Sequence, residues 1–95
     1  MKAVIEQDKV IEHDDPINFL PRTVENSVKF IKDAATKDEP FFLYVPFGSP
    51  HTPILPTPKW QGKSGLGKYA DFVMETDDGV GQILKAVDDL SLIHI

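Results

Sequence analysis

The sequence contains no cysteine, which excludes a disulfide scaffold, a thiolate zinc site and a cysteine nucleophile within this chain. It also lacks any run of about 18 apolar residues, so no membrane-spanning segment is expected. Basic residues are the minority charge: ten Lys and Arg against fifteen Asp and Glu give a net charge of −5. An acidic chain repels phosphate backbones overall, so binding to nucleic acid is not expected.

An N-terminal signal peptide is not expected either, because residues 1–10 are charged and lack an apolar core. A length of 95 residues fits one small domain with a modest core. Hydrophobic residues make up 41% of the chain, a globular composition that argues against general disorder. Proline is the residue type in excess, since five of the eight prolines fall between Pro46 and Pro58.

The first third of the chain predicts a hairpin followed by a helix. Two β-branched pairs at 4–5 and 10–11 flank a polar turn and predict a small hairpin over 3–12. Residues 13–22 are expected to be irregular, because a residue that precedes proline disfavours the helix. Thr23 is the expected N-cap of a helix whose apolar residues recur at 24, 28, 31 and 35.

The middle of the chain predicts a buried strand and a long loop. Residues 41–47 are uninterruptedly apolar and lie between proline and glycine, which is typical of a strand buried on both faces. A helix followed by such a strand is half of a βαβ unit, so we predict an α/β fold. Residues 48–67 are rich in proline and glycine, and we expect a packed, ordered, functional loop there instead of a free linker.

The last third predicts one long helix over 68–90, with a face of apolar residues at three- and four-residue spacing. Glu75 and Asp77 are expected on the opposite, solvated face. The apolar spacing continues through Gly79 and Gly81, and we expect both glycines to allow close backbone packing. Residues 91–95 form an apolar tail that we interpret as a non-native read-through, with a short strand as the alternative.

Several short motifs match binding sites only superficially. The Gly62–Ser64 stretch resembles the end of a phosphate-binding loop, and Gly65–Ala70 fits a loose dinucleotide pattern. Neither follows a strand directly, so both are interpreted as turns. The adjacent pair Asp14–Asp15 is expected to lie in a loop and the pair Asp77–Asp78 on a solvated helix face, and no metal ligand is assigned.

His51 is the residue with the strongest case for chemistry. It directly follows the predicted strand, and prolines at positions 50 and 53 restrict its backbone. In parallel α/β sheets ligands bind beyond the carboxyl ends of strands, and an imidazole can bind an anion or donate a proton. From its position alone, His51 is either a functional residue or a satisfied structural histidine.

Three sequence blocks, found in this order along the chain, support a functional role for His51. They are residues 40–53 (PFFLYVPFGSPHTP), 60–71 (WQGKSGLGKYAD) and 75–81 (ETDDGVG). Together they resemble the middle of a type I sulfatase, an arylsulfatase-like member of the alkaline phosphatase superfamily. The resemblance covers about residues 22–90. It implies hydrolysis of sulfate esters by a formylglycine with a bound calcium ion, in an α/β/α sandwich around a mixed, mostly parallel sheet. It further implies that His51 contacts the substrate sulfate and helps to protonate the leaving alcohol.

The resemblance implies that 1–90 is part of a sulfatase catalytic domain. Residues 1–21 would be a peripheral hairpin and loop, and 22–90 would form the helix, core strand, active-site loop and long helix. The motif Cys or Ser-x-Pro-x-Arg that yields formylglycine is absent, as are recognisable calcium ligands, so this chain alone is expected to be inactive. Both cofactors are expected in a longer parent protein, whose family members are commonly periplasmic, secreted or lysosomal.

Two alternatives stay open at this point. The parent could be a phosphodiesterase or phosphonate hydrolase of the same superfamily, since the retained loop does not identify the ester. The chain could instead be a small binding module whose proline-rich loop, with Trp60, forms the surface for a partner.

Overall fold

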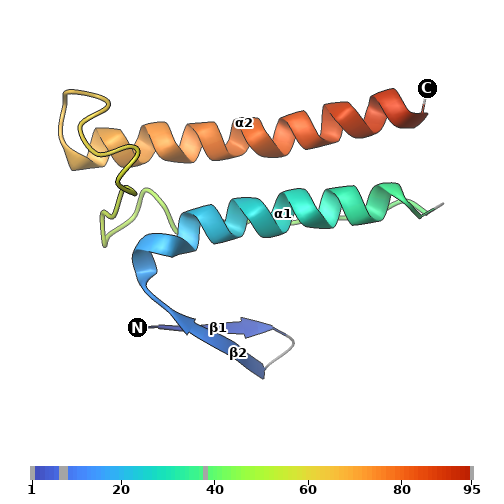
Figure 1. Ribbon diagram of the computed structural model, residues 1–95, viewed down its shortest axis with the longest axis horizontal. Helices are drawn as coiled ribbons and strands as arrows, with labels where there is room; N and C mark the ends of the chain where they lie inside the picture. The colour runs from blue at the N-terminus through green and yellow to red at the C-terminus, as the bar shows by residue number, and fades with distance from the viewer. Residues whose placement is uncertain (1, 7–8, 38, 95) are drawn as a thin grey trace.

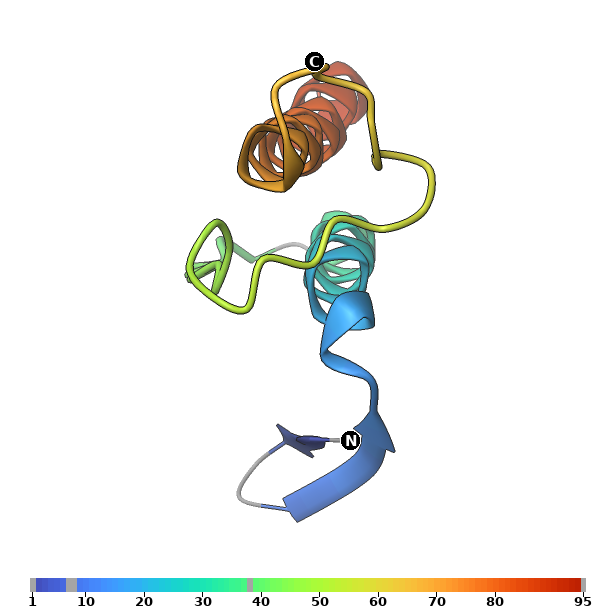
Figure 2. The same cartoon turned by 90° about the vertical axis from the view of Figure 1, so that its left-hand side faces the viewer.

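The structure is a computed structural model that describes residues 2–6, 9–37 and 39–94, with side chains over 14–37 and 39–90. Its elements are strands β1 (Lys2–Glu6) and β2 (Lys9–Asp14), a short 3-10 helix (Pro16–Asn18) and helices α1 (Phe19–Ala35) and α2 (Lys68–His94). The two helices lie side by side and run in the same direction, with the hairpin below α1 (Figure 1). After α1 the chain returns along one side of that helix, so the loop that follows lies at the N-terminal ends of both helices (Figures 1 and 2).

The predicted hairpin is confirmed. β1 and β2 pair antiparallel, with Ala3 opposite His13 and Ile5 opposite Val10, and the register shifts between Val4 and Ile5. The polar turn predicted at 7–9 falls largely on residues 7–8, which lie outside the described residues.

Helix α1 begins earlier than predicted, so the expectations of irregular structure to residue 22 and of an N-cap at Thr23 are wrong. The side chain of Asp15 caps the 3-10 helix by accepting from the backbone N–H of Ile17 at 3.2 Å. Pro21 lies in the first turn of α1, where N–H groups have no acceptor within the helix and a proline costs little. Thr23 instead donates its hydroxyl to the carbonyl oxygen of Phe19 at 2.8 Å.

The small core lies between α1 and α2. It is centred on Leu20, Val24 and Phe72, all less than a tenth exposed. Gly79 permits close packing as predicted, because an added Cβ would lie 2.7 Å from Cγ2 of Val24. The same expectation is wrong for Gly81, where an added Cβ would meet nothing within 4 Å.

The predicted core strand is not formed in the described part of the chain. Residues 41–47 are extended beside α1 (Figure 2) but have no ladder partner, so the predicted mostly parallel sheet is also not found there. Phe41 meets Phe30 of α1 edge-on at 5.7 Å between ring centroids. On the other side Phe42 is 86% exposed and Tyr44 is 76% exposed. Hydrophobicity indicated the extended backbone correctly, but a strand also needs a neighbour whose N–H and C=O groups complete the ladder.

Helix α2 confirms the predicted long helix and continues through the backbone of residues 91–94. The alternative of a short strand for the tail is therefore wrong, whereas its non-native origin stays a prediction. In the described residues, no helix combines the length and apolarity that crossing a bilayer requires.

Candidate functional site

His51 lies in a tight turn at the beginning of the loop. Its backbone N–H donates to the carbonyl oxygen of Gly48 at 3.1 Å. Its ring Nδ1 lies 2.8 Å from the carbonyl oxygen of Thr52. A carbonyl oxygen only accepts, so Nδ1 carries the hydrogen in this arrangement. Nε2 is then the ring nitrogen that can hydrogen-bond a ligand: it accepts in the neutral ring and donates in the imidazolium.

His51 lines a cavity of about 350 Å³ at the N-terminal end of α1. Arg22 of α1 and Phe72 of α2 line the same cavity, so three segments far apart in sequence meet around it. Its other walls are largely apolar, and they include Phe19, Leu20, Phe47, Pro53 and Leu55. The first turn of a helix favours negative charge, and an imidazolium and a guanidinium bind oxyanions. The cavity therefore suits a small anion on an apolar body.

Arg22 is a residue that sequence reasoning missed. Its Nη2 lies 2.6 Å from Oδ2 of Asp14, and the two side chains are 28% and 20% exposed. Asp14 also accepts from the side-chain amide of Asn18 at 3.0 Å. The bond from Arg22, followed by the bond from Asn18, lowers the pKa of Asp14 to about 2. The expectation of a loop at Asp14–Asp15 is wrong for Asp14, which is the last residue of β2. No local spacing indicated its contact with Arg22 across the 3-10 helix.

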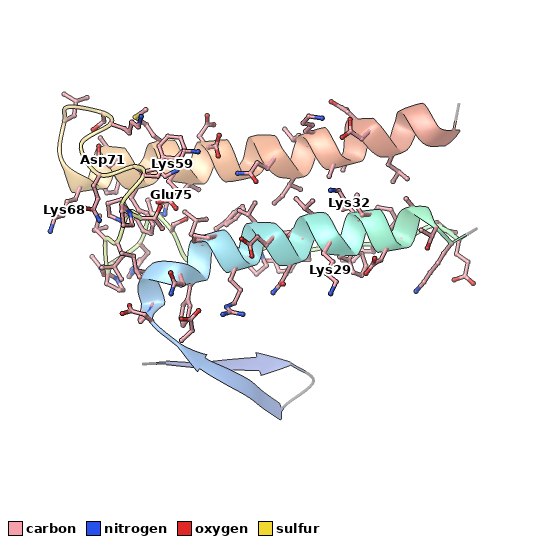
Figure 3. The ribbon with its side chains drawn as sticks, viewed as in Figure 1. Lys29, Lys32, Lys59, Lys68, Asp71 and Glu75 are labelled. Atoms are coloured by element: carbon pink, nitrogen blue, oxygen red, sulfur yellow. The ribbon has the colours of Figure 1, made fainter. Side chains whose placement is uncertain are left out.

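The loop is attached to α2 by buried acidic side chains near the helix N-terminus (Figure 3). Asp71 is 3% exposed and accepts three bonds: Gly62 N–H at 2.8 Å, Ser64 N–H at 2.9 Å and Ser64 hydroxyl at 2.6 Å. The Ser64 hydroxyl, followed by the two backbone N–H groups, lowers the pKa of Asp71. A carboxylate that accepts three bonds from one turn fixes that turn to the helix.

Glu75, one turn further along α2, holds a second point of the loop. Its two carboxylate oxygens accept from the N–H of Thr57 at 2.9 Å and from its hydroxyl at 3.0 Å. The prediction that Glu75 lies on the solvated face is wrong, because the side chain is only 6% exposed. The signal that was missed is its four-residue spacing from Asp71, which puts both carboxylates on one side of the helix.

A third attachment reaches the turn that carries His51. The hydroxyls of Ser49 and Thr76 lie 2.7 Å apart, and Thr76 donates to the carbonyl oxygen of Phe72 at 2.8 Å. Thr76 therefore accepts from Ser49. The expectation of an ordered loop is confirmed, and its order comes from these polar contacts together with the packing of Ile54 against the core.

The described residues do not fit a calcium ion. No three acidic or histidine side chains come together in the described part of the chain, whereas calcium takes six to eight oxygen ligands. The carboxylates of Asp71 and Glu75 are occupied by the loop, and Asp77 and Asp78 face solvent as predicted. A formylglycine precursor is not provided either, since the sequence has no cysteine and no Ser-x-Pro-x-Arg motif.

The comparison with family models decides the family. The model described as Sulfatase matches residues 20–92, about three quarters of the chain. The chain belongs to the sulfatase family. That match includes most of the residues that line the cavity, the His51 turn and all three attachments of the loop to α2.

Individual members of the sulfatase family match over 56 to 73 residues. An N-acetylgalactosamine-6-O-sulfatase of Bacteroides thetaiotaomicron is 43% identical over 56 residues, covering 59% of this chain and 11% of the relative. The human N-acetylgalactosamine-6-sulfatase is 37% identical over 73 residues, which cover 77% and 14%. Human arylsulfatase A is 38% identical over 62 residues, which cover 65% and 12%. No solved structure matches the chain significantly. The chain thus corresponds to between 11% and 14% of the length of these relatives.

Proposed function

We propose that this chain is a segment of the catalytic domain of a sulfuric ester hydrolase, and that His51 is a catalytic residue. In this proposal the Nε2 atom of His51 hydrogen-bonds the sulfate group and protonates the oxygen of the leaving alcohol. The observation that carries the proposal is the placement of His51: its Nδ1 lies 2.8 Å from the carbonyl oxygen of Thr52, and the residue lines the cavity. A proton donor must keep one orientation as charge develops on the leaving oxygen.

The remaining machinery would come from other parts of the longer protein. The nucleophile and calcium ligands have no counterpart among the described residues, so we expect no hydrolysis by the 95-residue chain alone. Residues 41–47 would join the mostly parallel sheet of an α/β/α sandwich. The exposed side chains of Phe42 and Tyr44, on a segment without ladder partners, support that role because they need cover from other segments.

The substrate alcohol is proposed to belong to a sulfated amino sugar. Two of the relatives carry N-acetylgalactosamine-6-sulfatase or its 6-O form in their names. The relatives' names give no support to a phosphodiesterase or phosphonate hydrolase. A direct comparison of sulfate monoester and phosphate diester hydrolysis by the full-length protein distinguishes the two classes.

The role of His51 can be tested in the full-length sulfatase with the variant His51→Gln. We expect kcat on a sulfated N-acetylgalactosamine substrate to fall by about 10²- to 10⁴-fold, the usual contribution of a positioned proton donor. The loss on 4-nitrophenyl sulfate is expected to be smaller, because its acidic phenol leaves with little protonation. Unchanged kcat on both substrates would disprove the assignment, and an equal loss on both would remove the proton-donor role. His13→Gln, a change in β2, is the matched control and is expected to leave both rates unchanged.

A further inference from the structure

The turn that carries His51 is held by little packing. Residues 48 and 51–53 are exposed, and Ser49 is half-buried. The hydrogen bonds within the turn are local: His51 N–H donates to Gly48, and the ring Nδ1 lies near the carbonyl oxygen of Thr52. Local bonds fix the shape of a turn but not its position relative to the cavity. A segment with so few buried contacts needs an attachment to a rigid element if it is to keep one position.

Thr76 of α2 provides such an attachment. Its hydroxyl oxygen lies 2.7 Å from the hydroxyl oxygen of Ser49, 27 residues away in the sequence. Thr76 gives its one hydroxyl hydrogen to the carbonyl oxygen of Phe72 at 2.8 Å, so Ser49 is the donor of the first bond. Two hydrogen bonds in a row polarise and strengthen one another. Since Ser49 belongs to the turn that ends at His51, these two bonds join that turn to the helix.

The end point of the two bonds belongs to the cavity itself. Phe72 is 7% exposed, is part of the core, and lines the same cavity as His51. The bonds therefore connect the α2 wall of the cavity with the turn that carries the imidazole. The carboxylates of Asp71 and Glu75 hold the loop further along, at residues 57, 62 and 64.

We propose that Thr76 is a positioning residue for His51. Through Ser49 it keeps the turn at one distance from the cavity wall, and so keeps Nε2 of the imidazole within reach of the substrate. The proposal rests on the proposed sulfatase function and deepens it, because it gives a residue of α2 a part in proton transfer by His51. Displacement of a reacting group by about 1 Å can cost about 10²-fold in rate, so a single attachment point can matter for catalysis.

The first experiment compares variants of the full-length sulfatase. Thr76→Val keeps the shape of the side chain without its hydroxyl, and Ser49→Ala removes the donor. Each is expected to lower kcat on a sulfated N-acetylgalactosamine substrate by about 2- to 10-fold, the usual net effect of one hydrogen bond. The loss on 4-nitrophenyl sulfate is expected to be smaller, because its acidic phenol leaves with little protonation.

Two further variants separate positioning from a general loss of packing. Thr76→Ser keeps the hydroxyl and is expected to retain the parent's kcat. The double variant Ser49→Ala, Thr76→Val is expected to lose no more than either single variant, because both changes remove the same bond. Additive losses in the double variant, or a Thr76→Ser variant as slow as Thr76→Val, would overturn the proposal. An equal loss on both substrates would do the same.

Ser27→Ala is the matched control in α1. Ser27 is 6% exposed, and its hydroxyl donates to the carbonyl oxygen of Thr23 at 2.7 Å, so the change removes a buried hydroxyl whose bond stays within one helix. It is expected to leave the ratio of the two rates unchanged. A change in that ratio as large as that of Thr76→Val would show that any lost hydroxyl has the same effect, which would contradict a specific role for Thr76.

A second measurement needs no catalytic activity. NMR of the imidazole nitrogens in the 95-residue chain reports which nitrogen of the neutral ring carries the hydrogen. The parent chain and Thr76→Ser are expected to carry it on Nδ1, and Thr76→Val is expected to show a mixture of both forms. An unchanged ring in Thr76→Val would contradict the proposal. Failure of this proposal alone would leave the loss in His51→Gln intact, whereas failure of the proposed function would abolish that loss and leave the NMR difference in place.

Discussion

The loop over residues 48–67 and the extended segment over 41–47 are adjacent in sequence and opposite in character. The loop is polar and rich in proline and glycine, yet three side chains of α2 fix it at Ser49, Thr57 and the turn at 62–64. The extended segment is the most apolar stretch of the chain, yet Phe42 and Tyr44 face solvent. Order in the loop comes from hydrogen bonds to α2, including those to its buried carboxylates. The extended segment is apolar, but it has no ladder partner in the described part of the chain.

The largest expected effect comes from making the same substitution in the packed core beneath the loop and in the extended segment. Phe72→Ala removes a buried ring from the core and is expected to lower the free energy of unfolding by about 3–5 kcal/mol. Phe42→Ala removes an exposed ring and is expected to change it by less than about 0.5 kcal/mol. Urea unfolding of the 95-residue chain, followed by circular dichroism, measures both.

Equal losses in the two variants would contradict the contrast between a packed and an unpartnered region. The full-length protein sharpens the comparison further. If residues 41–47 join a sheet there, Phe42→Ala should destabilise that protein clearly, although it leaves the shorter chain unchanged.

A second pair of substitutions tests the close approach of α2 to α1. Gly79→Ala places a Cβ 2.7 Å from the stiff, β-branched side chain of Val24, so the helices must separate. We expect a loss of about 1–3 kcal/mol from overpacking. Gly81→Ala adds a methyl group in open space and is expected to stabilise the helix by up to about 1 kcal/mol. Thermal unfolding that gave the two variants the same sign would disprove this packing.

The smallest effect concerns pH. Because the pKa of Asp14 is about 2 in the folded chain, against an ordinary value of 3.8, its contribution is present above pH 4 and is lost as pH falls toward about 2. The pKa of Asp71 is also lowered, so its contribution is lost in the same direction. The urea midpoint should therefore fall with acidification below about pH 4.

Asp71→Asn should be less stable at neutral pH and should lose less stability on acidification, because one of the two titrating groups is gone. Asp77→Asn is the matched control at an exposed position and should follow the parent chain. A parent chain whose midpoint does not change between about pH 4 and pH 2 would contradict the attachment through ionised carboxylates.

Much of the fold was predictable because its signals are local. The hairpin follows from two β-branched pairs, and both helices follow from apolar residues at three- and four-residue spacing. The start of α1 could not be predicted, because the sequence around a proline in the first turn of a helix looks the same as the sequence around a proline that ends a helix. The candidate site was predictable only at His51, since Arg22, Asp71, Glu75 and Thr76 act through contacts with residues distant in sequence.

The sequence by itself determined the hairpin, the two helices and the family and drew attention to His51, because periodicity and motif spacing are properties of neighbouring residues. The tertiary structure decided which polar side chains are buried. It turned Glu75 from the expected solvated face toward Thr57, joined Arg22 to Asp14 and left Phe42 uncovered. The physical reason is that burial depends on which segments meet, and a carboxylate is buried only where N–H and O–H groups from another segment replace its water.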